Sequence, residues 1–118
     1  RGINYDALYK KYGITSDDDI SIIRSKIANS ADGMVWKEDG FMSVCPNLDE
    51  ENLPWICADK DIRLIIDVEA GVDARVFPWD YEKEILLNYG QQFNITDIKE
   101  VKINEKNKIF IYMKHIIQ

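Results

Sequence analysis

The sequence predicts an α+β domain, and three observations support this. Two helix patterns come first and about six strand patterns follow, so helices and strands are segregated along the chain. The 118 residues are enough for one domain with a real core and too few for two. Apolar residues make up 46% and charged residues 31%, as in an ordinary globular protein. No repeat, low-complexity tract or internal linker interrupts this single unit.

The first part of the chain predicts two helices. Tyr5–Tyr12 has Asn4 as a suitable N-cap and Gly13 as a suitable C-terminal stop. A second helix is expected over Asp17–Asn29, where hydroxyl groups and then acids suit the positive end of the helix dipole. This capping reading is preferred over a cation site, since acids at a helix start need no ion. The residues expected to face inward are Tyr5, Leu8, Tyr12, Ile20, Ile23 and Ile27.

The rest of the chain predicts strands separated by turn signals, after a connector at Met34–Glu38. Pro46 ends the first of these strands, and Asn104–Lys108 is expected to be a hairpin loop. Residues 47–61 are expected to form a loop, with one helical turn as an open alternative within it. The expected strands are Phe41–Cys45, Arg63–Val68, Ala74–Phe77, Glu84–Asn88, Ile98–Ile103 and Ile109–Ile116, and Gln91–Ile95 is a further candidate. Most of these strands should pair in antiparallel fashion, because short turns join them.

Composition argues against several function classes. The net charge is −6 and no Lys/Arg-rich run occurs, which argues against nucleic-acid binding. No apolar run reaches the roughly 18 residues of a membrane span. Cys45 and Cys57 do not form a disulfide scaffold, and with His115 as the single histidine no metal site is expected. His115 lies in an apolar strand pattern, where packing is a commoner role than catalysis.

Residues 79–88 contain two carboxylates at the start of a strand pattern. Side chains alternate along a strand, so Glu82 and Glu84 share one face and Lys83 takes the other. The aromatic residues Trp79 and Tyr81 come just before. Alone, this stretch fits a solvated strand edge as well as a catalytic one.

Three fragments occur in a fixed order along the chain: Arg1-Gly2, then residues 39–45 (D-G-F-M-S-V-C), then residues 81–87 (Y-E-K-E-I-L-L). This order and spacing resemble the ADP-ribosyltransferase exoenzyme family, the mono-ADP-ribosyltransferase toxins of the arginine–serine–glutamate, E-x-E type. That family has R-G at the end of a first strand, a G-F-x-S-T-S strand and an E-K-E strand after an aromatic loop. The resemblance extends over essentially the whole chain.

The resemblance implies a split β-sandwich fold and a reaction that transfers ADP-ribose from NAD to an arginine of a target protein. It implies catalytic roles for Glu84, Glu82, Ser43 and Arg1, with NAD held by Arg1, Gly2, Ser43 and Glu84. Glu82 goes with arginine as the acceptor, and Trp79, Tyr81 and Glu82 would face the target. NAD is then a substrate, no metal is needed, and the protein is a bacterial or phage effector delivered to a host cytosol, with a delivery or antitoxin partner possible.

The sequence also departs from the family pattern. Ser43-Val44-Cys45 stands where the family has Ser-Thr-Ser, and a thiol is a weaker donor than a hydroxyl. The family's first strand and helix are expected upstream of Arg1. These departures leave a second interpretation open, a catalytically weak or inactive binding module of a larger toxin or phage protein. Three simpler interpretations also remain open: Arg1 as a solvated chain end, Ser43 as an ordinary strand position and Trp79 as a core anchor.

Overall fold

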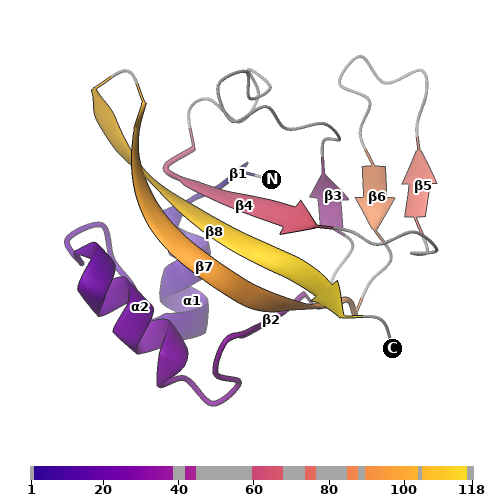
Figure 1. Cartoon of the computed structure of the whole chain (residues 1–118), viewed down its shortest axis with the longest axis horizontal. Helices are drawn as coiled ribbons and strands as arrows, with labels where there is room; N and C mark the ends of the chain where they lie inside the picture. The colour runs from indigo at the N-terminus through magenta and orange to yellow at the C-terminus, as the bar shows by residue number, and fades with distance from the viewer. Residues whose placement is uncertain are drawn as a thin grey trace.

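In the part of the chain that it describes, the computed structural model has two sheets and two helices (Figure 1). It describes residues 2–38, 60–67, 90–103 and 105–116 in full, and the backbone of residues 42–44, 74–76 and 85–87. The helices are α1 (Tyr5–Tyr12) and α2 (Ile20–Ala28). The strands are β1 (Gly2–Ile3), β2 (Val35–Lys37), β3 (Met42–Val44), β4 (Ile62–Asp67), β5 (Ala74–Val76), β6 (Ile85–Leu87), β7 (Gln92–Ile103) and β8 (Lys106–Ile116).

The larger sheet has five strands in the order β1-β4-β8-β7-β2, and the smaller has three in the order β3-β6-β5. Within these described strands β4 and β8 run parallel and every other pair is antiparallel. In Figure 1 the two helices lie at the lower left and the three-stranded sheet at the upper right. The α+β class and the mainly antiparallel pairing are therefore confirmed.

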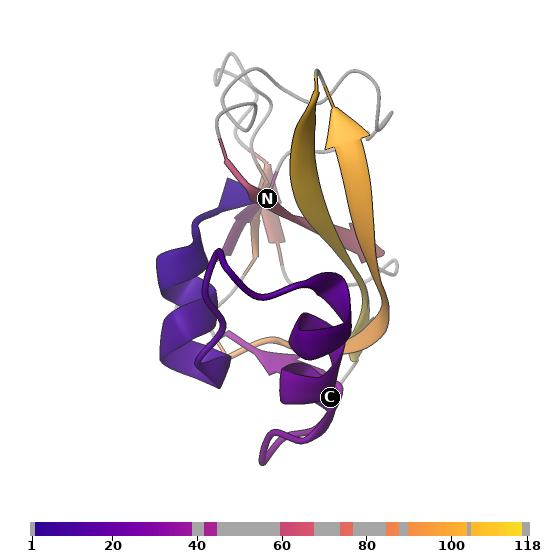
Figure 2. The same cartoon turned by 90° about the vertical axis from the view of Figure 1, so that its left-hand side faces the viewer.

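The hydrophobic core lies between the helices and one face of the five-stranded sheet. Leu8 of α1 and Ile23 and Ile27 of α2 are fully buried there, as their helical spacing predicts. Figure 2 shows both helices on the same side of the β7–β8 hairpin. On β4 and β8 the core residues alternate along the strand: Ile62 and Leu64, then Ile109, Ile111 and Met113. Residues at the intervening positions therefore lie on the opposite face of the sheet.

The predicted ends of α1 are correct. Gly13 adopts φ 71°, the left-handed conformation that favours glycine, and its N–H donates to the Tyr9 carbonyl. Asn4 takes the N-cap position with extended backbone, without a side-chain hydrogen bond to the helix.

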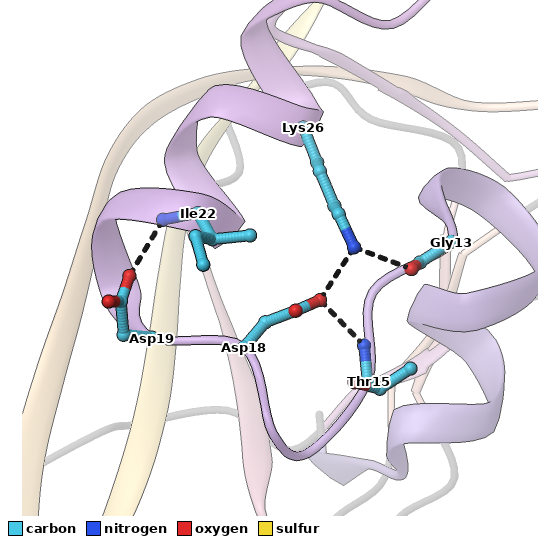
Figure 3. Close-up of polar contacts among 6 residues, drawn as sticks. All are labelled: Gly13, Thr15, Asp18, Asp19, Ile22 and Lys26. Atoms are coloured by element: carbon cyan, nitrogen blue, oxygen red, sulfur yellow. Dashed lines mark hydrogen bonds and ion pairs between the residues drawn. The ribbon is translucent and has the colours of Figure 1, made fainter.

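The start of α2 differs from the prediction, because Asp19 caps the helix from the position before it (Figure 3). The Asp19 carboxylate accepts the backbone N–H of Ile22 at 2.9 Å, so Asp19 is the N-cap and no hydroxyl takes that role. The Asp18 carboxylate accepts from Lys26 Nζ at 2.8 Å and from the Thr15 N–H at 3.0 Å. These two bonds, that of Lys26 first, lower the pKa of Asp18.

Three other boundaries were wrong. The expected connector at Met34–Glu38 contains β2, which pairs with β7. The two strands expected at Gln91–Ile95 and Ile98–Ile103 form one strand, β7, with a register irregularity between Ile95 and Asp97. The expected loop at Asn104–Lys108 is shorter, because β8 begins at Lys106.

Candidate functional site

Gly2 lies in the five-stranded sheet, next to β4. Its strand, β1, has two residues, which pair with Arg63 and Ile62 of β4. Ile3 is 8% exposed and belongs to the core, so the core holds the end of this short strand. Arg1 lies outside the described residues.

Ser43 lies in the three-stranded sheet, paired with β6. The ladder joins Ser43 to Leu86 and Val44 to Ile85, and β6 pairs with β5 on its other side. Directly opposed residues of an antiparallel ladder share a face, so position 43 shares the face of position 86. Glu82 and Glu84, just before β6 in the sequence, lie outside the described residues, as do Trp79 and Tyr81.

The structure thus brings the serine strand next to the strand that follows the two glutamates in the sequence. It places Gly2 in the other sheet. The roles expected for Glu84, Glu82, Ser43, Arg1 and Gly2 stay predictions, because the side chains that would define the site are outside the described residues or, at Gly2, absent.

Buried cations on the sheet face opposite the helices were not predicted from the sequence. Arg63 is 4% exposed, and its guanidinium carbon lies 5.8 Å from the centre of the Phe110 ring. Lys108 is 3% exposed and donates to the carbonyl oxygen of Lys60 at 2.9 Å. The usable sequence signal was a single charged residue inside the apolar run of residues 62–66. Buried charges of this kind need a structural or functional reason.

A cavity of about 100 Å³ lies on the helical side of the sheet, between the end of α1, the turn after α2, and β2. Three charged residues are among those that line the cavity: Lys11, Asp32 and Lys37. Lys11 Nζ donates to the carbonyl of Lys37 and lies 4.6 Å from the centre of the Trp36 ring. Lys37 pairs with Asp32 at 3.0 Å. This cavity contains none of the predicted site residues.

Two further observations bear on cofactors and membranes. Within the described part of the chain, no group of three or more His, Cys, Asp or Glu is arranged to hold a metal ion. Neither of the two helices is long and apolar enough to cross a membrane. His115 is 7% exposed and its Nε2 lies 2.5 Å from Gln91 Oε1, which agrees with the packing role expected for it.

Solved structures with the same fold are ADP-ribosyltransferase toxins. Plx2a from Paenibacillus larvae matches with a TM-score of 0.74 at 14% identity, over 99% of this chain and 59% of that one. C3stau2 from S. aureus, solved with NAD, gives 0.70 at 20% identity, over 100% and 60%. BECa of a C. perfringens binary enterotoxin, solved with NADH, gives 0.67 at 16% identity, over 98% and 29%. This chain therefore spans about three-fifths or less of these relatives.

The sequence comparison agrees with the fold. None of the curated proteins matches the sequence. The model of the ADP-ribosyltransferase exoenzyme family matches residues 1–118, which is the whole sequence. The chain therefore belongs to the ADP-ribosyltransferase exoenzyme family.

Proposed function

We propose that this protein transfers ADP-ribose from NAD to an arginine of a target protein and releases nicotinamide. In this proposal residues 1–118 form one ADP-ribosyltransferase domain. The observation that carries it is the β3–β6 ladder, which sets Ser43 opposite Leu86, two residues after Glu84 in the sequence. Family membership over residues 1–118 supports the reaction class.

The reaction breaks the bond between nicotinamide and C1′ of its ribose and forms a bond from C1′ to a guanidinium nitrogen. The acceptor nitrogen loses a proton. The sugar passes through a cation of the oxocarbenium type, whose charge is present only in the transition state.

Glu84 stabilises that charge in this proposal. A carboxylate about 4 Å from the cation, at an effective dielectric constant near 20, gives on the order of 4 kcal/mol. This is roughly a thousandfold in rate. The Ser43 hydroxyl is a donor that fixes the Glu84 rotamer, and strand alternation predicts positions 84 and 43 on one face.

Glu82 engages the acceptor. An arginine side chain carries a permanent positive charge, so a carboxylate can pair with it, orient it and help remove its proton. Trp79 and Tyr81 form the surface toward the target protein. Arg1 binds the NAD phosphates or ribose as a forked donor, and Gly2 allows close backbone approach to the nicotinamide amide.

The test compares the protein with Glu84→Gln and Glu82→Gln, using labelled NAD and a host-cell lysate. The unmodified protein should label a target and release nicotinamide, and Glu84→Gln should lose about a thousandfold of both. Glu82→Gln should abolish transfer to arginine and keep part of the NAD hydrolysis. Unchanged transfer by Glu82→Gln would contradict the role of that residue.

A second candidate function is supported by the Ser43-Val44-Cys45 sequence, which has lost two hydroxyl groups of the family pattern. In this alternative the domain binds a partner within a larger toxin or phage protein and catalyses weakly or not at all. If the unmodified protein shows no transfer and no NAD hydrolysis, that result would favour this alternative and reject the enzyme. Delivery to a host cell, with a delivery or antitoxin partner, fits both.

A further inference from the structure

We propose that the outer edge of β7 at Lys99–Ile103 pairs with the same segment of a second copy of this chain. The two strands would run antiparallel about a twofold axis at Val101 and join the two five-stranded sheets. Figures 1 and 2 both show the β7–β8 hairpin extending beyond the helices, and the side chains of Lys99, Glu100 and Lys102 are exposed. This pairing is independent of the proposed function.

The backbone groups of Glu100 and Lys102 face away from β8. In the β7–β8 ladder Glu100 lies opposite Ile109. The N–H of Ile109 donates to the carbonyl of Asp61, just before β4, so Ile109 turns its backbone groups toward β4 and not toward β7. Hydrogen-bonded and non-hydrogen-bonded pairs alternate along an antiparallel ladder, so Glu100 and Lys102 both belong to non-hydrogen-bonded pairs. Their N–H and C=O groups therefore point outward, to the edge of the sheet.

The free part of this edge begins after Ile98. By the same alternation Ile98 also turns its backbone outward, but nearby side chains bond to both of its groups. Its N–H donates to the Asp97 carboxylate at 2.8 Å, and its carbonyl oxygen accepts from Arg24 at 3.0 and 2.6 Å. Strand β2 ends its pairing earlier in β7. Within the described ranges no residue bonds to the outward groups of Glu100 and Lys102, so another strand can add there.

The length of the free edge selects one register. Strand β7 ends at Ile103, so the free segment is Lys99–Ile103 and Val101 is its centre. Two antiparallel copies overlap along the whole segment only when Val101 lies opposite Val101 of the second copy. In that register Glu100 exchanges backbone hydrogen bonds with Lys102 of the second copy, and Lys102 does so with its Glu100.

The charge pattern selects the same register. Directly opposed side chains share a face, so each Glu100 carboxylate meets a Lys102 ammonium group of the other copy. A register centred on Glu100 would oppose two carboxylates, and one centred on Lys102 would oppose two ammonium groups. On the other face the half-buried Val101 meets its own copy, and Ile103 lies beside the apolar stem of Lys99. The segment is therefore complementary to itself in both length and charge.

A pairing of this size is weak and selective. The two segments are short, and the area that they bury falls below the roughly 1,200 Å² of stable interfaces. We therefore expect a dissociation constant on the order of 0.1 mM. Charged side chains on an edge strand oppose pairing with most other strands. The same charges favour the one partner that places the opposite sign across from each of them, which is a second copy of this chain.

The experiment measures self-association by analytical ultracentrifugation over concentrations that span the expected dissociation constant. The unmodified protein should change from monomer to dimer. Glu100→Lys and Lys102→Glu each oppose like charges twice across the axis, so each should weaken association by at least about tenfold. Glu100→Lys moves the net charge from −6 toward zero and Lys102→Glu moves it away. General repulsion between copies therefore cannot explain a loss in both variants.

The double variant Glu100→Lys/Lys102→Glu is the matched rescue. It exchanges the two charges, keeps the net charge at −6 and should restore the dimer. Amide hydrogen exchange locates the interface in the unmodified protein. The amides of Glu100 and Lys102 should become protected as concentration rises. The Ile98 amide already donates to Asp97, so its exchange should stay the same.

Three results would overturn this proposal. The first is a protein that stays monomeric at about ten times the expected dissociation constant. The second is a dimer that both single charge reversals leave intact. The third is a dimer without added protection at Glu100 and Lys102, because another surface would then form the contact.

Discussion

Arg24 connects α2 to the edge of the five-stranded sheet, and its removal should cost measurable stability. Its Nε and an Nη donate to the carbonyl oxygen of Ile98 at 3.0 and 2.6 Å. Ile98 lies in β7 beyond Asn94, where the β2–β7 ladder ends. The guanidinium therefore holds the helix to a part of β7 that β2 does not reach.

The magnitude follows from this geometry. A hydrogen bond from a charged donor contributes about 1.5–3 kcal/mol, but here two donors share one oxygen and water reaches the exposed side chain. We therefore take the lower end and expect Arg24→Met to lose about 1.5 kcal/mol. For a domain of this size that is a fall of about 6 °C in Tm.

Urea denaturation and thermal unfolding measure this loss. Met keeps the apolar stem of the side chain, so the change reports mainly the two hydrogen bonds. Arg24→Lys keeps one donor and should fall between the two proteins. Lys102→Met, at an exposed position of β7, is the control and should change stability by less than about 0.5 kcal/mol. An Arg24→Met variant as stable as that control would refute the reasoning.

Three other outcomes are expected. Leu8→Ala, at a fully buried position, should lose about 2–5 kcal/mol in denaturation, and Leu8→Met less than about 1.5. The pKa of Asp18 is lowered in the folded state, so ionised Asp18 stabilises the folded protein above the unfolded-state pKa. This stabilisation is lost as the pH falls through the folded-state pKa. Asp18→Asn should therefore flatten the acid side of a plot of unfolding free energy against pH. Burial, and then the charge of Asp32, raise the pKa of Tyr12 from 10.0 to about 12. The neutral Tyr12 therefore stabilises the folded protein below pH 10.0, and this stabilisation should be lost as the pH rises toward 12. Tyr12→Phe should remove the late phase of an ultraviolet titration of the tyrosines.

Local rules predicted the elements whose signals lie within one turn of the chain. Both ends of α1 were predicted correctly. The C-terminal end was predictable because Gly13 suits the left-handed conformation that ends a helix. The predicted start of α2 was wrong, because the two hydroxyl residues and the three acids that precede Ile20 can all act as caps. Which acid caps the helix depends on Lys26, eight residues beyond Asp18, which holds Asp18 away from the helix end. That choice is made by the contacts of the Lys26 side chain with the loop before the helix.

The missed strands have a different cause. Three-residue β2 is too short to show alternation, and it exists because β7 offers Gln92–Asn94 as partners. The irregularity near Asp97 interrupts the alternation of β7, so one bent strand reads as two. The Arg63–Phe110 contact could not be predicted from the sequence either, because a parallel ladder brings together two residues that are 47 positions apart.

Glu82 and Glu84 precede β6 in the sequence, so the place of β6 in its sheet bears on how these two glutamates are interpreted. By sequence alone, alternating charges before Ile85 fit a solvated edge. β6, however, is the central strand of its sheet, with β3 on one side and β5 on the other. Glu82 and Glu84 lie outside the described residues, and strand alternation continued back along the sequence from β6 predicts them on the face shared by positions 86 and 43. A solvated edge does not require a serine strand at this register, whereas the proposed reaction needs a hydroxyl donor there, so the ladder is compatible with the roles proposed for Glu82 and Glu84.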